Sequence, residues 1–162
     1  MYTKFCAALS KASLVLAVVL LIAVILCVQW QVIGRYILND TPTWAEALAL
    51  LLVLFVTAFG LAVGVRDAGH IGLESMVVLL PERWQHRIEI LIHVLVGGFG
   101  VLMVYGGGQW AIAKWGEKKP MLPVPDGIDY VPLALAGVLI VLFSIEHVIA
   151  LVRGTEVEPS WN

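Results

Sequence analysis

Four long apolar runs constrain this chain more than any other feature of its sequence. They cover residues 12–33, 44–65, 88–113 and 130–152. The hydrocarbon core of a bilayer is crossed by roughly 20 helical residues. Each run is long enough to do so, and the sequence therefore predicts an all-α membrane protein with four transmembrane helices.

The composition agrees with a chain that lies mostly in lipid. Of its 162 residues, 60% are apolar and 14% are charged, whereas a soluble domain carries about a quarter of its residues as charges. The formal charge of −2 leaves no broad basic surface for nucleic acid. What remains between the runs is short, so residues 1–162 are predicted to form a single integral membrane domain.

The first run is predicted to be a retained helix. It exceeds the roughly 7 to 15 apolar residues of a secretory signal, and no small-residue cleavage site follows it. An even number of spans puts both termini on one side of the membrane. Lysines and arginines favour the cytoplasmic side, and six on the side of the termini against four on the other predict cytoplasmic termini. The six are Lys4, Lys11, Arg66, Arg83, Arg87 and Arg153, and the four are Arg35, Lys114, Lys118 and Lys119.

The connection between the second and third runs mixes apolar and polar residues. Ile71, Leu73 and Met76 alternate with His70 and Glu74 over a stretch too short to cross a bilayer. Such a sequence is typical of a segment that lies in the membrane interface. We expect a short interfacial amphipathic segment here.

The stretch GRYILNDTPTWAE, residues 34–46, is a polar interruption between two apolar runs. Thr43 and Glu46 have the spacing of a capping box at a helix start. Tyr36 and Trp44 have the amphipathic rings favoured at headgroup depth, and Arg35 can extend its charge to the interface. A tight polar hairpin anchored at the interface accounts for these residues, and contact with a partner remains open beside it.

Two further features have both a structural and a partner-binding interpretation. Gly60 and Gly64 form a GxxxG pair in the second run, a spacing that lets another helix approach closely but also arises by chance in glycine-rich membrane helices. The third connection, residues 114–129, contains three prolines that favour a stiff, extended path. A loop of this kind keeps its shape when it is presented to a partner protein. The other interpretation is a simple stiff connector between two spans.

The spans carry few ionisable residues, and none near mid-depth, where a substrate or ion site is expected. Glu46 opens the second span, His93 lies early in the third, and Glu146 and His147 lie late in the fourth. The sequence contains no nucleophile with an adjacent base, phosphate loop or zinc-protease motif. We therefore expect no enzyme.

Two alternatives remain from these residues. Spans three and four run in opposite directions, which brings His93 and His147 to similar depth, where they could hold a haem b as paired axial ligands; an ordinary polar network with Glu89 and Glu146 is the other interpretation. A self-sufficient small four-helix transporter would need an acidic residue deep in a helix, and Glu46 and Glu146 both lie near helix ends.

The order of motifs from Trp30 to Glu74 resembles the DctQ-like small membrane subunit of tripartite ATP-independent periplasmic (TRAP) transporters. A second resemblance covers MLPVPDGIDYVPLALAG, residues 121–137. The residues that carry the resemblance are also the candidates for contact with partners, together with the glycine pair: Arg35, Tyr36, Asn39, Trp44, Glu46, Gly60, Gly64, Arg66, His70, Pro125 and Tyr130.

The resemblance implies a scaffold subunit in the bacterial inner membrane. In such systems a large membrane subunit, the M subunit, moves an organic acid such as a dicarboxylate or sugar acid inward with sodium. A periplasmic binding protein, the P subunit, captures that acid. The small subunit packs against the M subunit, so sodium is expected on that partner, and no cofactor, metal or substrate site is expected in this chain.

Overall fold

The fold is all-α, as the sequence predicts. The computed structural model describes residues 2–40, 42–67, 82–155 and 157, and within them every regular element is helical. Four helices are long and apolar enough to cross a membrane. The interfacial segment expected around residues 71–80 lies outside the described residues. The elements are α1 (Tyr2–Tyr36), α2 (Thr43–Asp67), α4 (Glu82–Ala113), the 3₁₀ helix η1 (Asp126–Tyr130) and α5 (Val131–Arg153).

Two helices begin earlier than their apolar runs. α1 starts at Tyr2, ten residues before the predicted boundary, and α4 starts at Glu82, six residues before it. At about 1.5 Å per residue, α1 is roughly 50 Å long, well beyond the roughly 30 Å hydrocarbon core. An apolar run marks only the most hydrophobic part of a helix, so a helical segment that contains polar residues, such as the one around Ser10, is not detected by it.

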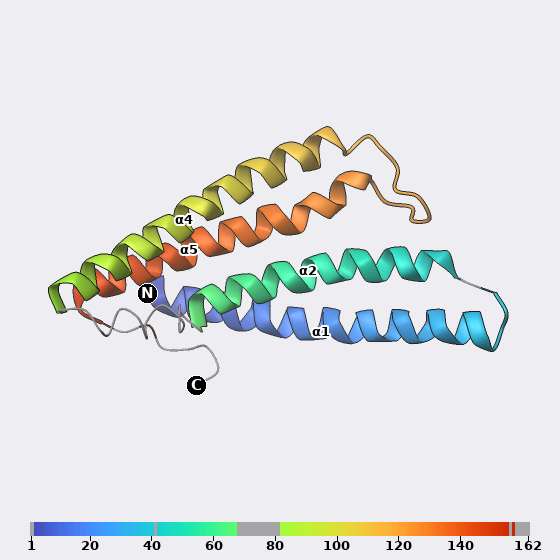
Figure 1. Cartoon of the computed structure of the whole chain (residues 1–162), viewed down its shortest axis with the longest axis horizontal. Helices are drawn as coiled ribbons and strands as arrows, with labels where there is room; N and C mark the ends of the chain where they lie inside the picture. The colour runs from blue at the N-terminus through green and yellow to red at the C-terminus, as the bar shows by residue number, and fades with distance from the viewer. Residues whose placement is uncertain (1, 41, 68–81, 156, 158–162) are drawn as a thin grey trace.

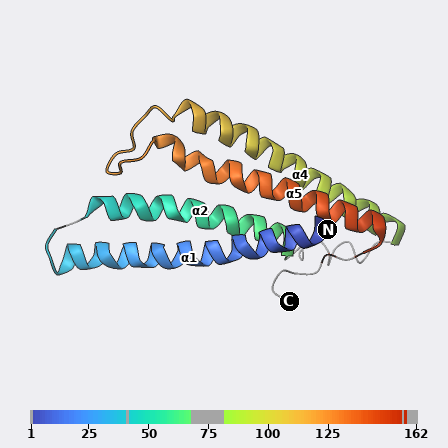
Figure 2. The same ribbon diagram turned by 180° about the vertical axis from the view of Figure 1, so that it is seen from behind.

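The helices form two antiparallel hairpins, α1–α2 and α4–α5 (Figure 1). The hairpins lie close together at the end that holds Tyr2 and Arg153, and they diverge toward their connecting loops, as both views show (Figure 2). The inner pair is α2 and α5, whereas α1 meets α5 over a short length only. The two connecting loops are thus displayed separately at the open end.

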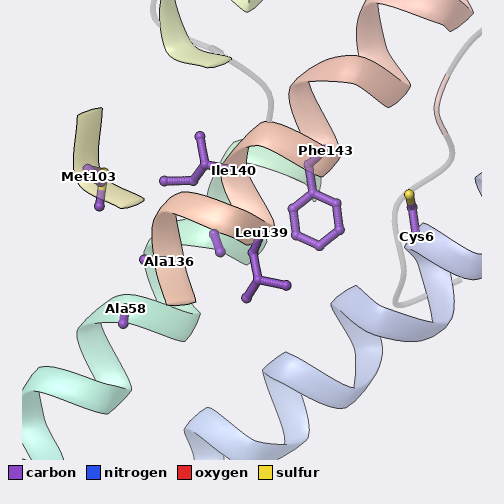
Figure 3. Close-up of a cluster of buried hydrophobic side chains, with 8 residues drawn as sticks. Cys6, Ala58, Met103, Ala136, Leu139, Ile140 and Phe143 are labelled. Atoms are coloured by element: carbon purple, nitrogen blue, oxygen red, sulfur yellow. The ribbon is translucent and has the colours of Figure 1, made fainter. Parts of the chain in front are cut away.

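The buried core lies where the hairpins converge (Figure 3). Phe143 and Ile140 of α5 are its largest apolar side chains. Ala58 and Ala62 of α2 face them, and small residues four apart let helices approach closely. The cluster consists of Cys6, Ala58, Ala62, Met103, Ala136, Leu139, Ile140 and Phe143, so all four helices contribute to it.

Gly100 of α4 and Gly137 of α5 make a close backbone contact between these two helices. A Cβ atom on Gly137 would lie 2.6 Å from the carbonyl oxygen of Gly100 and 2.8 Å from the backbone nitrogen of Val104. No side chain fits there without moving a backbone. By contrast, a Cβ atom on Gly60 or Gly64 would meet nothing within 4 Å, so the predicted glycine pair faces outward from this chain.

We expect Gly137→Ala to lower the stability of the chain, because its methyl group forces α4 and α5 apart. Overpacking of this kind costs about 1 to 3 kcal/mol. Thermal unfolding in detergent, followed by circular dichroism, measures the loss. Gly98→Ala is the matched control, since nothing lies within 4 Å of that position and alanine favours a helix over glycine. Equal melting temperatures for both variants would contradict the close contact.

Candidate functional site

Arg66, in the last turn of α2, is the centre of a buried charge network. Its Nε donates to Glu146 Oε2 at 2.8 Å and its Nη2 donates to Glu146 Oε1 at 3.1 Å. Its Nη1 donates to Asp67 Oδ1 at 2.7 Å. Only 2% of Arg66 and 2% of Glu146 are exposed. A two-pronged arginine–carboxylate pair of this kind is strong and directional, and it joins α2 to α5.

The other two helices connect to the same network. Ser10 Oγ of α1 donates to Asp67 Oδ2 at 2.9 Å. His147 Nε2 lies 3.0 Å from the carbonyl oxygen of Arg66, and because a carbonyl only accepts, this nitrogen carries the hydrogen. The ring of His93 on α4 stacks on that of His147, with centroids 4.4 Å apart and planes at 4°. All four helices therefore meet at this end of the bundle.

The network stabilises the bundle through pairing. A buried ion without a partner carries a desolvation penalty of several kcal/mol. The side chains of Arg66, Asp67 and Glu146 are at most 2% exposed, and each carboxylate is bound by the guanidinium. Both carboxylate oxygens of Glu146 are therefore occupied by hydrogen bonds from Arg66.

The antiparallel topology predicted that His93 and His147 lie at similar depth, and the structure brings their rings into direct contact. The geometry does not suit haem. Imidazole nitrogens bind iron in the plane of their rings, whereas face-to-face rings direct their nitrogens alongside one another and leave no space for a porphyrin between them. The stack instead packs α4 against α5 beside the charge network.

The sequence interpretation missed part of this network. It noted Arg66 and Glu146 separately, without pairing them, and it did not consider Asp67 or Ser10. A usable signal was present: spans two and four run in the same direction, so opposite charges at their ends share one leaflet. Ser10 fell outside the predicted span because α1 begins earlier than its apolar run.

The hairpin between α1 and α2 lies at the opposite end of the bundle. A Cβ atom on Gly34 would lie 2.6 Å from Pro42 Cδ, so the loop folds back directly over this glycine. Asn39 has a φ of 54°, a left-handed conformation that asparagine tolerates better than most residues. Glu46 Oε2 accepts from Gln31 Nε2 at 3.2 Å, and the capping box with Thr43 stays a prediction.

The residues proposed for partner contact in this hairpin are exposed. Tyr36 is 79% exposed and Trp44 is 47% exposed, and Ile37 beside Tyr36 is 75% exposed. Arg35, Asn39 and Glu46 are exposed as well. The hairpin therefore has a compact backbone of its own and displays both polar and apolar side chains.

The loop between α4 and α5 is held by internal bonds. Lys118 and Pro125 form an isolated antiparallel bridge, and Lys119 pairs with Asp129. Lys114 pairs with Glu117 at 2.7 Å, and this hydrogen bond and the carboxylate charge raise the pKa of Lys114. The loop therefore turns back on itself and is held by its own bonds, in place of the extended path that its prolines predicted.

Pro125 and Tyr130 have structural roles in this loop. Pro125 precedes η1 as its cap and takes part in the bridge, while Tyr130 precedes α5 and stacks on Trp110 of α4 with ring centroids 6.0 Å apart. Of the remaining candidates, Gly60 is exposed, Gly64 is half-buried, and His70 lies outside the described residues. The structure groups the candidates at two ends rather than in one site.

These features define a multi-pass membrane protein whose buried charges are paired within the chain at one end and whose ordered loops are displayed at the other. The sequence pattern of the family "Tripartite ATP-independent periplasmic transporters, DctQ component" matches residues 22–154. The chain belongs to this family of TRAP transporter small subunits. The resemblance noted in the motifs of residues 30–74 is confirmed.

Individual relatives agree with this assignment. The chain is 27% identical over 93 residues to the sialic acid TRAP transporter small permease protein SiaQ of Vibrio cholerae, which covers 57% of this chain and 54% of that protein. It is 20% identical over 146 residues to a putative TRAP transporter small permease protein of Haemophilus influenzae, with 88% of each chain covered. It is also 29% identical over 66 residues to the sialic acid TRAP transporter permease protein SiaT of H. influenzae, which covers 41% of this chain and 11% of that protein.

We expect Arg66→Met to destabilise the chain by about 3 to 5 kcal/mol, because it leaves the buried carboxylates of Asp67 and Glu146 without their guanidinium partner. Glu146→Leu is expected to cost less, since Arg66 keeps its pair with Asp67. The double variant is expected to lose less stability than the sum of the two single losses, since Arg66 and Glu146 are removed together and Asp67 keeps the hydrogen bond from Ser10. Unfolding of the four proteins of this double-mutant cycle in detergent measures the coupling. Lys114→Ala, which removes a half-exposed surface pair, is the control and is expected to leave the melting temperature almost unchanged. Additive losses in the double variant would contradict the pairing.

Asn39 offers a separate test of the hairpin. Asn39→Gly is expected to leave stability unchanged, because glycine adopts a left-handed conformation freely. Asn39→Val is expected to cost about 1 to 2 kcal/mol, since a branched side chain is strained there. Melting temperatures of the two variants measure the difference. A destabilised Asn39→Gly protein would show that the side chain, rather than the backbone conformation, matters at this position.

Proposed function

We propose that the chain is the scaffold subunit of a TRAP-type secondary transporter and packs against a large sodium-coupled membrane subunit. One observation carries this proposal beyond family membership. In the part of the chain that the structure describes, the buried arginine and glutamate side chains pair with each other near one end of the helices. The middle of the bundle is apolar, so transport chemistry belongs to a partner.

The match to SiaT supports a large membrane partner. The 66 matched residues make up 11% of that protein, so a segment similar to this chain occurs within a much longer permease. A subunit that is separate in one system and part of a longer permease in another is expected to lie against that permease in both. This argument favours lateral packing in the membrane.

The outward face of α2 is a candidate surface for this contact. Gly60 is exposed and Gly64 is half-buried, and both positions are open in this chain. Glycines four apart let a second helix approach its backbone closely. Leu61 beside them is 47% exposed and adds apolar area to the same helix.

The distribution of positive residues favours cytoplasmic termini in a bacterial inner membrane. In this orientation the Arg66 network lies on the cytoplasmic side. The hairpin around Tyr36 and the loop around Met121 then face the periplasm, where a substrate-binding protein is expected to dock. Met121 is 63% exposed on a loop whose shape is held by its own bonds, which suits a docking role.

The substrate is expected to be an organic acid, such as a dicarboxylate or a sugar acid, captured by the binding protein and moved by the large subunit. A self-sufficient transporter fits the structure less well. It requires an acidic residue that is able to exchange its partner for a substrate or ion, and Glu146 is bound through both oxygens to Arg66.

Affinity purification of the tagged chain from its native membrane, with mass spectrometry of bound proteins, tests the proposal. A large multi-pass partner in about equal amount is the expected result. Recovery of the chain alone as a stable oligomer would contradict the scaffold role and favour an independent transporter.

Leucine substitutions locate the contact. Gly60→Leu and Gly64→Leu are expected to reduce recovery of the large partner several-fold without lowering the melting temperature of the isolated chain, because both positions are open in it. Gly98→Leu on α4 is the matched control, being equally open. Unchanged recovery with all three variants would remove the face of α2 from the interface.

A further inference from the structure

A groove lies between α1 and α5, on the side of α2 where the two hairpins meet. Its volume is about 300 Å³ and its surface is almost wholly apolar. Phe59 of α2 contributes one wall, and Leu139 points from α5 toward α1 (Figure 3). The lining residues are Leu9, Ala12, Ser13, Leu16, Phe59, Leu135, Val138 and Leu139.

The groove results from how α1 and α5 are placed. Both pack on α2, but they meet each other over a short length only. One point of contact is the Tyr2 hydroxyl group, which donates to the carbonyl oxygen of Leu142 at 2.8 Å. Beyond it, the short side chains of Ala12 and Ser13 leave the space between the helices unfilled.

The size of the groove restricts what can occupy it. Two turns of an α-helix with its side chains, about 10 Å across and 11 Å long, fill roughly 850 Å³, nearly three times the volume present. A cavity of roughly 150 Å³ accommodates benzene, so 300 Å³ has room for about twelve carbon atoms. Water is unsuited, since a bound water requires two or more polar partners. The space fits a slender apolar chain.

The position of the groove along the helices points to one leaflet of the membrane. From Tyr2 to Leu16 α1 rises about 21 Å, similar to half the thickness of a bilayer with its headgroups, roughly 20 to 22 Å. Tyrosine rings favour the headgroup level, and Tyr2 lies beyond one end of the groove. A lipid whose headgroup is near Tyr2 would therefore place its chain between Leu9 and Leu16.

We propose that this groove is a binding site for one acyl chain of a membrane phospholipid. The acyl chain fills the space between α1 and α5 that neither helix closes. It contacts both hairpins at once, on the side of the molecule where they converge. Bound lipid thereby adds to the contacts between the hairpins that the Tyr2 hydrogen bond and the buried core already make.

Photolabelling of the full chain in nanodiscs tests this site. The probe is a phosphatidylcholine with a diazirine in one acyl chain, and labelled peptides are identified by mass spectrometry. Labelling of residues 9–16 and 135–139 is expected to exceed that of residues 94–102 several-fold, although Val94, Leu95 and Leu102 are among the most exposed side chains of α4. Labelling in proportion to exposure would overturn the proposal.

A substitution that fills the groove provides the second measurement. Ala12→Trp is expected to reduce labelling of residues 135–139 several-fold, and to remove the rise in melting temperature that added phosphatidylcholine gives the wild-type chain in detergent. Val101→Trp, on the exposed face of α4, is the control and is expected to change neither result. Equal lipid responses of the two variants would contradict the site.

The intact complex separates a lipid from a protein occupant. A photoreactive amino acid at position 12, in the chain purified with its native partners, is expected to cross-link to lipid. A cross-link to a partner polypeptide in place of lipid would show that a protein side chain fills the groove and would overturn the proposal.

Discussion

The bidentate pair of Arg66 with Glu146 is the interaction on which the arrangement of the bundle depends. It links α2 to α5, the inner helices of two hairpins that otherwise touch mainly through apolar side chains. In lipid, apolar contacts between helices gain little over contacts with acyl chains. A charged pair that would be exposed at high cost if the hairpins separated therefore favours one position of the hairpins over others.

The two ends of the molecule are stabilised by different contacts. At the network end, Ser10, Asp67, His147 and His93 add hydrogen bonds and ring contact around the ion pair. At the open end, each loop is ordered by its own bonds and has no need of the other hairpin. This division suits a subunit that keeps a fixed body in the membrane while displaying two surfaces to other proteins.

Small residues act in two ways in this chain. Gly100 and Gly137 are used internally, where two backbones touch. Gly60 and Gly64 have the more familiar sequence spacing, but a Cβ atom at either position would meet nothing within 4 Å among the described residues. The sequence does not reveal which glycines lie at a helix contact. Any glycine lets a second helix approach closely, and the placement of the neighbouring helix decides where this happens.

Much of the fold was predictable because lipid imposes a simple rule on sequence. Four apolar runs determined the four helices, and the antiparallel order of spans three and four predicted that His93 and His147 lie at similar depth. Motif order from Trp30 to Glu74 also indicated the family. Helix ends were less predictable, since the helical segment around Ser10 contains polar residues and so lacks the apolar signal that marks the rest of α1.

Only the tertiary structure decided which charges pair and which surfaces remain open. From the sequence alone, Arg66 is a cation at the end of a helix, and no local pattern indicates which acidic residue it pairs with. Its commitment to Glu146, eighty residues later, depends on the rotation of α2 and α5 about their axes. The same rotation brings Ala58, Ala62 and Phe143 into one buried cluster, a contact between distant segments that the local pattern of hydrophobicity does not encode.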